Sequence, residues 1–355
     1  MRRAVRSHPP AIAWMTLIAC AALAGCGEPE SGRQYPAAGP SATEPPSPPP
    51  PRDGFAVPDA RTRVRAAGAL AGLADGVRDA FAPGPGFIPI VPPGPGDWLA
   101  QHSEPGQTFD HYVASRPNRP GRGGRRAIYI LPIGELGPAA PPLDLLAAFT
   151  RAHFQLPVRV LPPISVADTR ARTRMQGERR QLLAPDLLEH LRTILPADAY
   201  ALVGLTAVDL YPGPDWNFVF GMASFRERVG VYSIARYHPS FAGGGGKSPA
   251  APWVLSRTLK VMAHEIGHMF GMEHCIYYEC VMNGSNHLAE TDRRPMNLCP
   301  VCLRKLHHAV GFSPRERYRD LGRFFRAFRL DSEAAWARAR AAELSPPDPA
   351  SPPPP

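Results

Sequence analysis

The segment HEIGHMFGMEH, residues 264–274, constrains this chain more than any other part of the sequence. His264 and His268 are four residues apart, so on a helix both imidazoles project from one face and can bind a single metal ion. Glu265 lies beside them, near a water that such an ion would bind, where a carboxylate can act as a general base. The pattern therefore predicts a metal-bearing helix with its own base.

Gly271 decides where the third histidine goes. A helix continued through this position would carry His274 away from the other two, but glycine accepts the left-handed conformation that ends a helix. The chain can then turn and bring His274 back to the metal. Three neutral imidazoles leave the fourth position of a tetrahedral zinc open to water, which is typical of catalytic rather than structural zinc.

Cysteines follow the third histidine at once. Four of the six cysteines in the chain lie within 28 positions, and the last two form a C-x-x-C pair. They are Cys275, Cys280, Cys299 and Cys302. Thiolates with this spacing suit a closed four-cysteine zinc site, which has no room for water and is therefore structural.

The complete pattern, H-E-x-x-H-x-x-G-x-x-H-C followed by C-x-M and C-x-x-C, resembles that of the archaemetzincins, a branch of the metzincin metallopeptidases. The resemblance implies two zinc ions per chain, one catalytic and one structural, lying close together. It implies that Glu265 is the catalytic base and that Met282 is the Met-turn residue beneath the catalytic zinc. The four cysteines would then bind the second zinc.

Upstream of the motif, strand patterns alternate with helix patterns. Strands are expected at 127–133, 158–161 and 200–208, helices at 60–81, 143–153, 186–195 and 314–344, and a hairpin at 216–225 with 229–236. With the resemblance, this order predicts an α/β, metzincin-like zincin fold: a mixed twisted sheet, an active-site helix and a small C-terminal subdomain carrying the second zinc. In metzincins an edge strand binds the substrate backbone, and 216–225 is the candidate; Phe218 and Phe220 could equally pack into the core from its other face.

The N-terminus carries a secretion pattern. Three arginines, at positions 2, 3 and 6, precede 15 uncharged residues, too few for a spanning helix but suited to a signal peptide. The stretch ends in Leu-Ala-Gly-Cys26, which resembles the lipobox of bacterial lipoproteins, where the cysteine is acylated. This implies an extracytoplasmic protein, lipid-anchored through Cys26 to a bacterial membrane, in the outer membrane or cell envelope. A plain secretory signal or a spanning anchor is the alternative.

Composition divides the chain into four parts. Residues 1–25 are the predicted lipoprotein signal peptide, 26–54 a Pro-rich tether, 55–344 an archaemetzincin-like catalytic domain, and 345–355 a disordered Pro-rich tail. The tether and the tail have almost no apolar residues to bury, so no packed structure is expected there.

The formal charge of +9 does not indicate nucleic-acid binding. Removal of the three signal-peptide arginines lowers it to +6, and the remaining basic residues are spread along the chain. The expected partners are a peptide or protein substrate and, through Cys26, a membrane.

These observations predict a zinc metallopeptidase, either an endopeptidase or an aminopeptidase, in which Glu265 activates a zinc-bound water. Three alternatives remain at this stage. Glu290 could replace His274 as the third ligand, as in thermolysin-like enzymes. The four cysteines could form two disulfides in an oxidising compartment. The domain could also be a zinc-stabilised module that binds peptides or cell-envelope components without cutting them.

Overall fold

The computed structural model describes residues 17–19, 54–121, 124–237, 241 and 252–344. The predicted lipidation site, the tether up to residue 53, the tail and the rest of the signal peptide lie outside the described residues. The glycine run at 243–246 lies outside them too. Among the helices that are described, none combines the length and the apolar character needed to cross a membrane.

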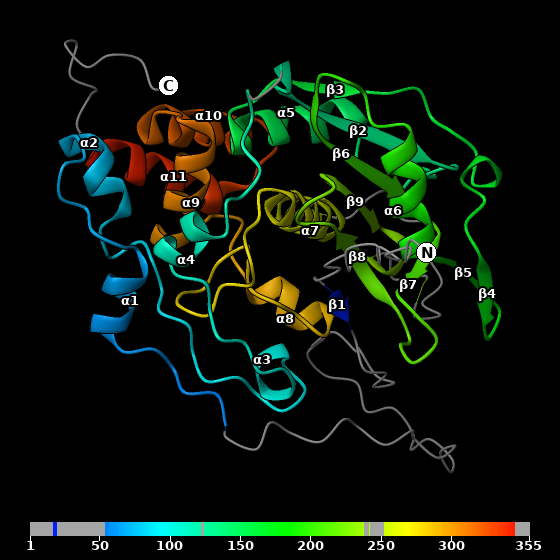
Figure 1. The fold of residues 1–355 in the computed structure, drawn as a ribbon, viewed down its shortest axis with the longest axis horizontal. Coiled ribbons are helices and arrows are strands. Elements are labelled where there is room, and N and C mark those ends of the chain that lie inside the picture. Colours follow the sequence, from blue (N-terminus) through cyan, green and yellow to red (C-terminus); the bar gives the residue numbers. More distant parts are fainter. Residues whose placement is uncertain (1–16, 20–53, 122–123, 238–240, 242–251, 345–355) are drawn as a thin grey trace, which may run out of the picture.

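The strands, which all precede α7 (Pro252–Met269) in the chain, form one mixed β-sheet (Figure 1). Its strands follow the order β3-β2-β6-β9-β8-β7-β5-β4, and β1 pairs with β8 beside this path. The pairs β2–β3, β2–β6, β6–β9 and β5–β7 are parallel, whereas β4–β5, β7–β8, β8–β9 and β1–β8 are antiparallel. The strands are β1 (Leu17–Ala19), β2 (Ala127–Ile133), β3 (Val158–Val160), β4 (Thr173–Gln176), β5 (Arg179–Leu183), β6 (Ala199–Thr206), β7 (Asp209–Tyr211), β8 (Val219–Ala223) and β9 (Val229–Ser233).

Helices cover both faces of the sheet, which gives three layers. α6 (Ala184–Thr193) packs on β6, β8 and β9, and α7 (Pro252–Met269) packs on the same strands from the other side, next to α5 (Leu143–Phe154). Because both faces are covered, β2 and β6 are buried at every position, and their sequences are continuously apolar rather than alternating. This confirms the predicted α/β class and the mixed sheet with a long helix against it.

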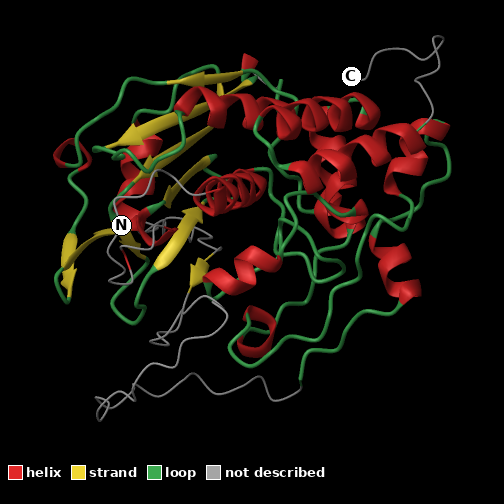
Figure 2. Ribbon diagram, turned by 180° about the vertical axis from the view of Figure 1, so that it is seen from behind, coloured by secondary structure: helices red, strands yellow, loops and turns green. Residues whose placement is uncertain are grey.

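The C-terminal helices form a second group, on the opposite side of α7 from the sheet (Figure 2). They are α8 (Leu288–Arg293), α9 (Pro300–Val310), α10 (Pro314–Ala327) and α11 (Asp331–Glu343). Short helices from the N-terminal part pack around them: α1 (Ala60–Ala66), α2 (Asp75–Arg78), α3 (Trp98–Gln101) and α4 (Phe109–Ala114). The rings of Phe149 in α5 and Phe324 in α10 lie tilted to each other with centroids 5.4 Å apart, and they join this group to the helices that cover the sheet.

Two predicted helices were wrong in extent. The helix expected at 60–81 ends after α1, because Gly68 and Gly72 adopt φ of +72° and +83°, conformations that a helix cannot contain. The helix expected at 314–344 is two helices, α10 and α11, and Arg329 at φ +57° turns the chain between them. Three short strands, β4, β5 and β7, and the helix α9 were not predicted.

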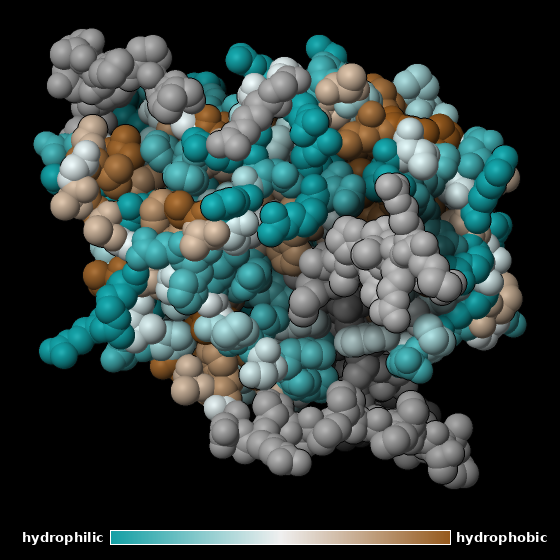
Figure 3. Space-filling view, in the orientation of Figure 1, coloured by the Kyte–Doolittle hydropathy of each residue, from teal (hydrophilic) through white to brown (hydrophobic). Residues whose placement is uncertain are grey.

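On the face shown in Figure 3, hydrophilic residues cover most of the centre and apolar residues gather in small patches between them. Most apolar side chains of the strands and of α5, α6 and α7 are instead buried in one core. On this face the fold thus places mostly polar residues over a core that the sheet and α7 share.

Candidate metal centres and active site

The C-terminal half of α7 carries the first two histidines and the glutamate of the motif. His264, Glu265 and His268 are 1%, 0% and 0% exposed, so all three lie inside the protein. As the four-residue spacing predicts, both imidazoles leave the same side of the helix, and their Nε2 atoms are 2.8 Å apart.

The turn at Gly271 brings in the third histidine. α7 ends at Met269, Gly271 adopts φ +80°, and its backbone N–H donates to the carbonyl of His268 over 2.8 Å. The ring of His274 then lies 5.3 Å from that of His264 and 5.2 Å from that of His268, measured between centroids. One ligand atom from each of the three histidines lies within 4.8 Å of the others.

The Nδ1 atoms of His264 and His268 each form a hydrogen bond that fixes the orientation of the ring. Nδ1 of His264 donates to the carbonyl of Val281 over 2.8 Å, and Nδ1 of His268 donates to that of Met272 over 2.6 Å. A proton on Nδ1 leaves a lone pair on Nε2, the form that binds metals. Burial, and then the neighbouring imidazoles, hold the pKa of His264 well below its usual value, so the ring stays neutral.

These lone pairs fit a metal ion. The Nε2 atoms of His264 and His268 are 2.8 Å apart, and both carry a lone pair. The two lone pairs repel each other unless a cation lies between them. Nε2 of His274 is buried and has no hydrogen-bond partner among the described residues. A buried acceptor without a partner is costly, and three converging imidazoles are a ligand set that zinc accepts.

Glu265 has the environment expected of a base. It is fully buried, and neither carboxylate oxygen has a hydrogen-bond partner in the described part of the chain. Burial raises its pKa well above the usual range, and the positive charge of Arg294 opposes this only in part. Burial of a carboxylate without a partner costs free energy, and a cation or a water molecule next to it would reduce that cost.

Met282 lies under the metal-bearing helix. A β-carbon added at Gly267 of α7 would come within 2.4 Å of its sulfur, so the two are in direct contact. The carbonyl of Met282 accepts a hydrogen bond from the backbone of Cys275 over 2.8 Å. Met282 therefore contacts the helix of His264 and His268 with its side chain and the segment of Cys275 with its backbone.

The four cysteines form a second cluster. All are buried and free, and one sulfur from each lies within 4.8 Å of the others. The sulfurs of Cys275 and Cys299 are 3.6 Å apart, near the roughly 3.8 Å that a tetrahedral zinc imposes and far from the roughly 2.05 Å of a disulfide. Burial disfavours ionisation of Cys275, yet hydrogen bonds from the other three thiols hold its pKa well below the usual value. The arrangement fits a metal.

A segment that the sequence did not single out also reaches the histidines. Residues 97–107, called the strap below, cross the loop that follows Gly271, and Glu104 accepts a hydrogen bond from Nδ1 of His274 over 2.7 Å. The same oxygen, Oε1, accepts from the indole N–H of Trp98 over 2.8 Å. The ring of Trp98 meets His274 edge to face at 4.9 Å and stacks on His102 at 3.8 Å.

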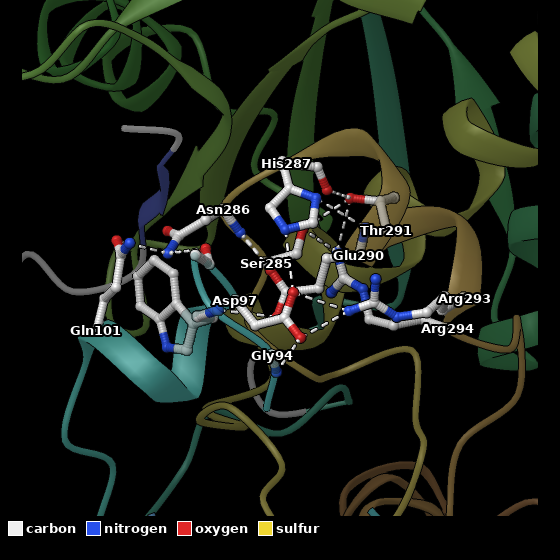
Figure 4. Close-up of polar contacts among 12 residues, drawn as sticks. Gly94, Asp97, Gln101, Ser285, Asn286, His287, Glu290, Thr291, Arg293 and Arg294 are labelled. Atoms are coloured by element: carbon white, nitrogen blue, oxygen red, sulfur yellow. Dashed lines mark hydrogen bonds and ion pairs between the residues drawn. The ribbon is translucent and has the colours of Figure 1, made fainter. Parts of the chain in front are cut away.

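The N-terminal end of the strap is fixed by a polar network with the Ser285–Arg294 region, drawn in Figure 4. Asp97 accepts from Nε2 of His287 over 3.0 Å and from Arg293 over 2.8 Å. Glu290 accepts from the backbone N–H groups of Trp98 and Asn286 over 2.9 and 2.7 Å, and burial raises its pKa to about 7.

Glu290 thus lies outside the histidine group, which His264, His268 and His274 form without it. Asp97, His287 and Glu290 do lie close enough together to hold an ion, but protein groups already hydrogen-bond to each of them. We assign no metal there.

The C-terminal end of the strap is fixed by Gln107. Its amide N–H donates to the carbonyl of Gly271 over 3.0 Å, and its amide oxygen accepts from the backbone of Glu273 over 3.3 Å and from Lys305 over 2.9 Å. Gly106 approaches so closely that an added β-carbon would lie 2.5 Å from Ile276. The strap is therefore tied on both sides of Glu104.

Comparisons with known proteins identify a family to which this chain is similar. Peptidase family M54 matches residues 154–308. Archaemetzincin-2 of Macaca fascicularis is 38% identical over 278 residues, which cover 70% of this chain and 77% of that protein, and human archaemetzincin-2 gives the same values. A solved archaemetzincin from Methanopyrus kandleri is 30% identical, covering 53% of this chain and 97% of its own, with a TM-score of 0.41. The strap lies upstream of the M54 match.

Proposed function

This chain belongs to the archaemetzincins, peptidase family M54, and from that membership we propose that it hydrolyses peptide bonds with a zinc ion bound by His264, His268 and His274. The convergence of three buried imidazoles beside Glu265, whose oxygens have no partner among the described residues, carries the proposal. A binding module that does not cut peptides is less well supported, because Glu265 is present and buried next to His264 on the same helix.

In the proposed reaction the zinc ion activates the carbonyl and a water molecule, and Glu265 transfers the proton. When bound, zinc polarises the scissile carbonyl and lowers the pKa of a water molecule. Glu265 accepts a proton from that water as it attacks the carbonyl, and later delivers the proton to the amine as the C–N bond breaks. The closed position of Glu265 between α7 and β8 keeps bulk water from competing for its oxygens.

We propose that the substrate backbone pairs with the outer edge of β8. The sequence analysis expected this strand to be an edge strand, but β8 is not the last strand of the sheet because β7 follows it. β7 pairs with β8 only between Leu210 and Val219, however. β1 pairs with β8 there, at Val219 and Met222, so this edge accepts an antiparallel strand. Cleavage of the signal peptide before Cys26 would remove β1 and open the edge to substrate.

We also propose that the cysteine cluster holds a second, structural zinc. Four sulfurs would fill the tetrahedral coordination and leave no place for water. The backbone N–H of Cys299 donates a hydrogen bond to the sulfur of Cys280 over 3.3 Å, so the protein backbone helps to fix this sulfur within the cluster.

The localisation remains a proposal that rests on the N-terminal sequence. Acylation of Cys26 would anchor the chain to a bacterial membrane outside the cytoplasm. Metabolic labelling with a fatty acid should mark the wild type and not Cys26→Ser. Wild-type protein released without label into the medium would refute the anchor.

The test of the activity uses the mature chain loaded with zinc and a mixed peptide library. We expect cleavage by the wild type and a loss of about 10²- to 10⁴-fold in Glu265→Gln, with the zinc content unchanged. Glu178→Gln, at an exposed turn between β4 and β5, is the matched control and should keep full activity. An equally active Glu265→Gln protein would overturn the mechanism.

A further inference from the structure

The three histidines of the site are not held alike. His264 and His268 stand on α7, and backbone carbonyls accept their Nδ1 protons. His274 stands in the loop after the helix, and its Nδ1 partner is a carboxylate 170 residues away in sequence. We propose that Glu104 is a positioning residue that orients His274 and strengthens binding of the catalytic zinc.

The chemistry of the pair supports this role. A carboxylate accepts the Nδ1 proton of His274 over 2.7 Å, which leaves the Nε2 lone pair directed at the other two imidazoles. The negative charge also makes the imidazole a stronger donor to a metal than a neutral carbonyl acceptor does. Loss of such an outer partner generally weakens metal binding about 10- to 100-fold.

His274 needs this support more than its neighbours do. The rings of His264 and His268 are fixed by a long buried helix, whereas His274 follows the turn at Gly271. Its Nε2 has no other hydrogen-bond partner among the described residues, so Glu104 makes the only polar contact that fixes this ring there.

Glu104 is itself well fixed. Its side chain is 19% exposed, and the indole N–H of Trp98 donates to the same oxygen that His274 uses. The indole also packs edge-on against the His274 ring. Because Asp97 and Gln107 tie down the two ends of the strap, the carboxylate cannot move away from the histidine without breaking several contacts.

A purely structural role is the alternative, in which Glu104 only fastens the strap to the loop. Glu279 provides a matched control for that role, since its carboxylate accepts from the backbone of Val91 over 3.4 Å. It therefore also links the N-terminal part to the segment between Cys275 and Cys280, and it has no hydrogen bond to a histidine among the described residues. Substitution of Glu279 should loosen the contact without changing zinc binding at His274.

The experiment measures zinc affinity on the mature chain by competition with a chelator, for the wild type, Glu104→Gln, Glu104→Ala and Glu279→Gln. We expect the histidine-bound zinc to be released at about 10-fold lower chelator concentration in Glu104→Gln and at still lower concentration in Glu104→Ala. The cysteine-bound zinc should stay, which also reports that the fold is intact. With cobalt in place of zinc, the visible absorption of the histidine site should change in both Glu104 variants and not in Glu279→Gln.

The outcomes separate two failures, because the inference rests on the proposed zinc site. If the wild type binds no zinc at the histidines, the proposed function fails. If the wild type binds it and Glu104→Gln has the same affinity and cobalt spectrum, the function stands and the role of Glu104 is overturned. Equal losses in Glu104→Gln and Glu279→Gln would also overturn it. Should Glu104→Ala fail to fold, the isosteric Glu104→Gln still decides.

Discussion

The backbone of Gly221 in β8 lies directly against the carboxylate of Glu265 in α7. A β-carbon at position 221 would come within 2.4 Å of Oε1 and 2.6 Å of Cδ. No side chain other than hydrogen fits there unless the whole carboxyl group of Glu265 moves. The strand proposed to bind substrate and the proposed base are therefore placed by the same contact.

We predict that Gly221→Ala lowers peptidase activity at least about tenfold, because the displaced base no longer meets the attacking water. Zinc content should not change, since the three atoms nearest to an added β-carbon at Gly221 all belong to Glu265 and none to a histidine. Gly213→Ala is the control, because an added β-carbon at position 213 has no atom within 4 Å. Activity equal to the wild type in Gly221→Ala would show that Glu265 is not held by this contact.

The cysteine cluster gives a second prediction. Cys299→Ser should lose one zinc per chain and unfold at lower temperature, because a closed zinc site contributes directly to folding. Activity should fall as well, since Cys275 hydrogen-bonds through its backbone to Met282 beneath α7. Mass spectrometry of the non-reduced protein provides the check. Two intact disulfides in the wild type would rule out the zinc assignment.

The local part of the site could be predicted from the sequence. His264, His268 and His274 lie within eleven residues, so helix geometry and one glycine turn are enough to bring them together. The cysteine cluster spans 28 positions and follows from the same short-range reasoning.

The strap could not be predicted in this way. Glu104 stands in a Pro- and Gly-rich region with no periodic pattern, and its contact with His274 depends on how distant parts of the chain pack. Position along the sequence carries no information about such a contact. The strands β4 (TRMQ) and β5 (RRQLL) were missed for a different reason. Both are short and rich in polar residues, and neither shows the alternation of apolar and polar residues that indicates a strand.

Glu290 gives a prediction about pH. Burial raises its pKa to about 7, so the folded protein holds this proton more tightly than the unfolded chain does. Its contribution to stability is therefore fully present below the ordinary carboxyl pKa and is lost as the pH rises through about 7. The free energy of unfolding of the wild type, relative to Glu290→Gln, should fall by up to roughly 3 kcal/mol between pH 4 and pH 8.

Denaturant unfolding across this pH range, at fixed zinc concentration, measures the difference. Glu178→Gln, which alters an exposed carboxylate, should follow the wild type at every pH. Parallel pH profiles for the wild type and Glu290→Gln would contradict the raised pKa.

The final prediction concerns the turn at Gly271. Its φ of +80° suits glycine, and an added β-carbon would also come within 3.0 Å of Pro117. Gly271→Ala should therefore cost about 1–2 kcal/mol of stability from the backbone alone. Because the turn also directs His274, the variant should bind the catalytic zinc more weakly and lose activity in proportion.

Gly177→Ala separates the loss of stability from the loss of zinc. Gly177 lies in the β4–β5 turn and has φ +59°, but no atom lies within 4 Å of an added β-carbon there. That control should lose similar stability and keep its zinc, so an equal loss of zinc in both variants would mean that the turn does not place His274.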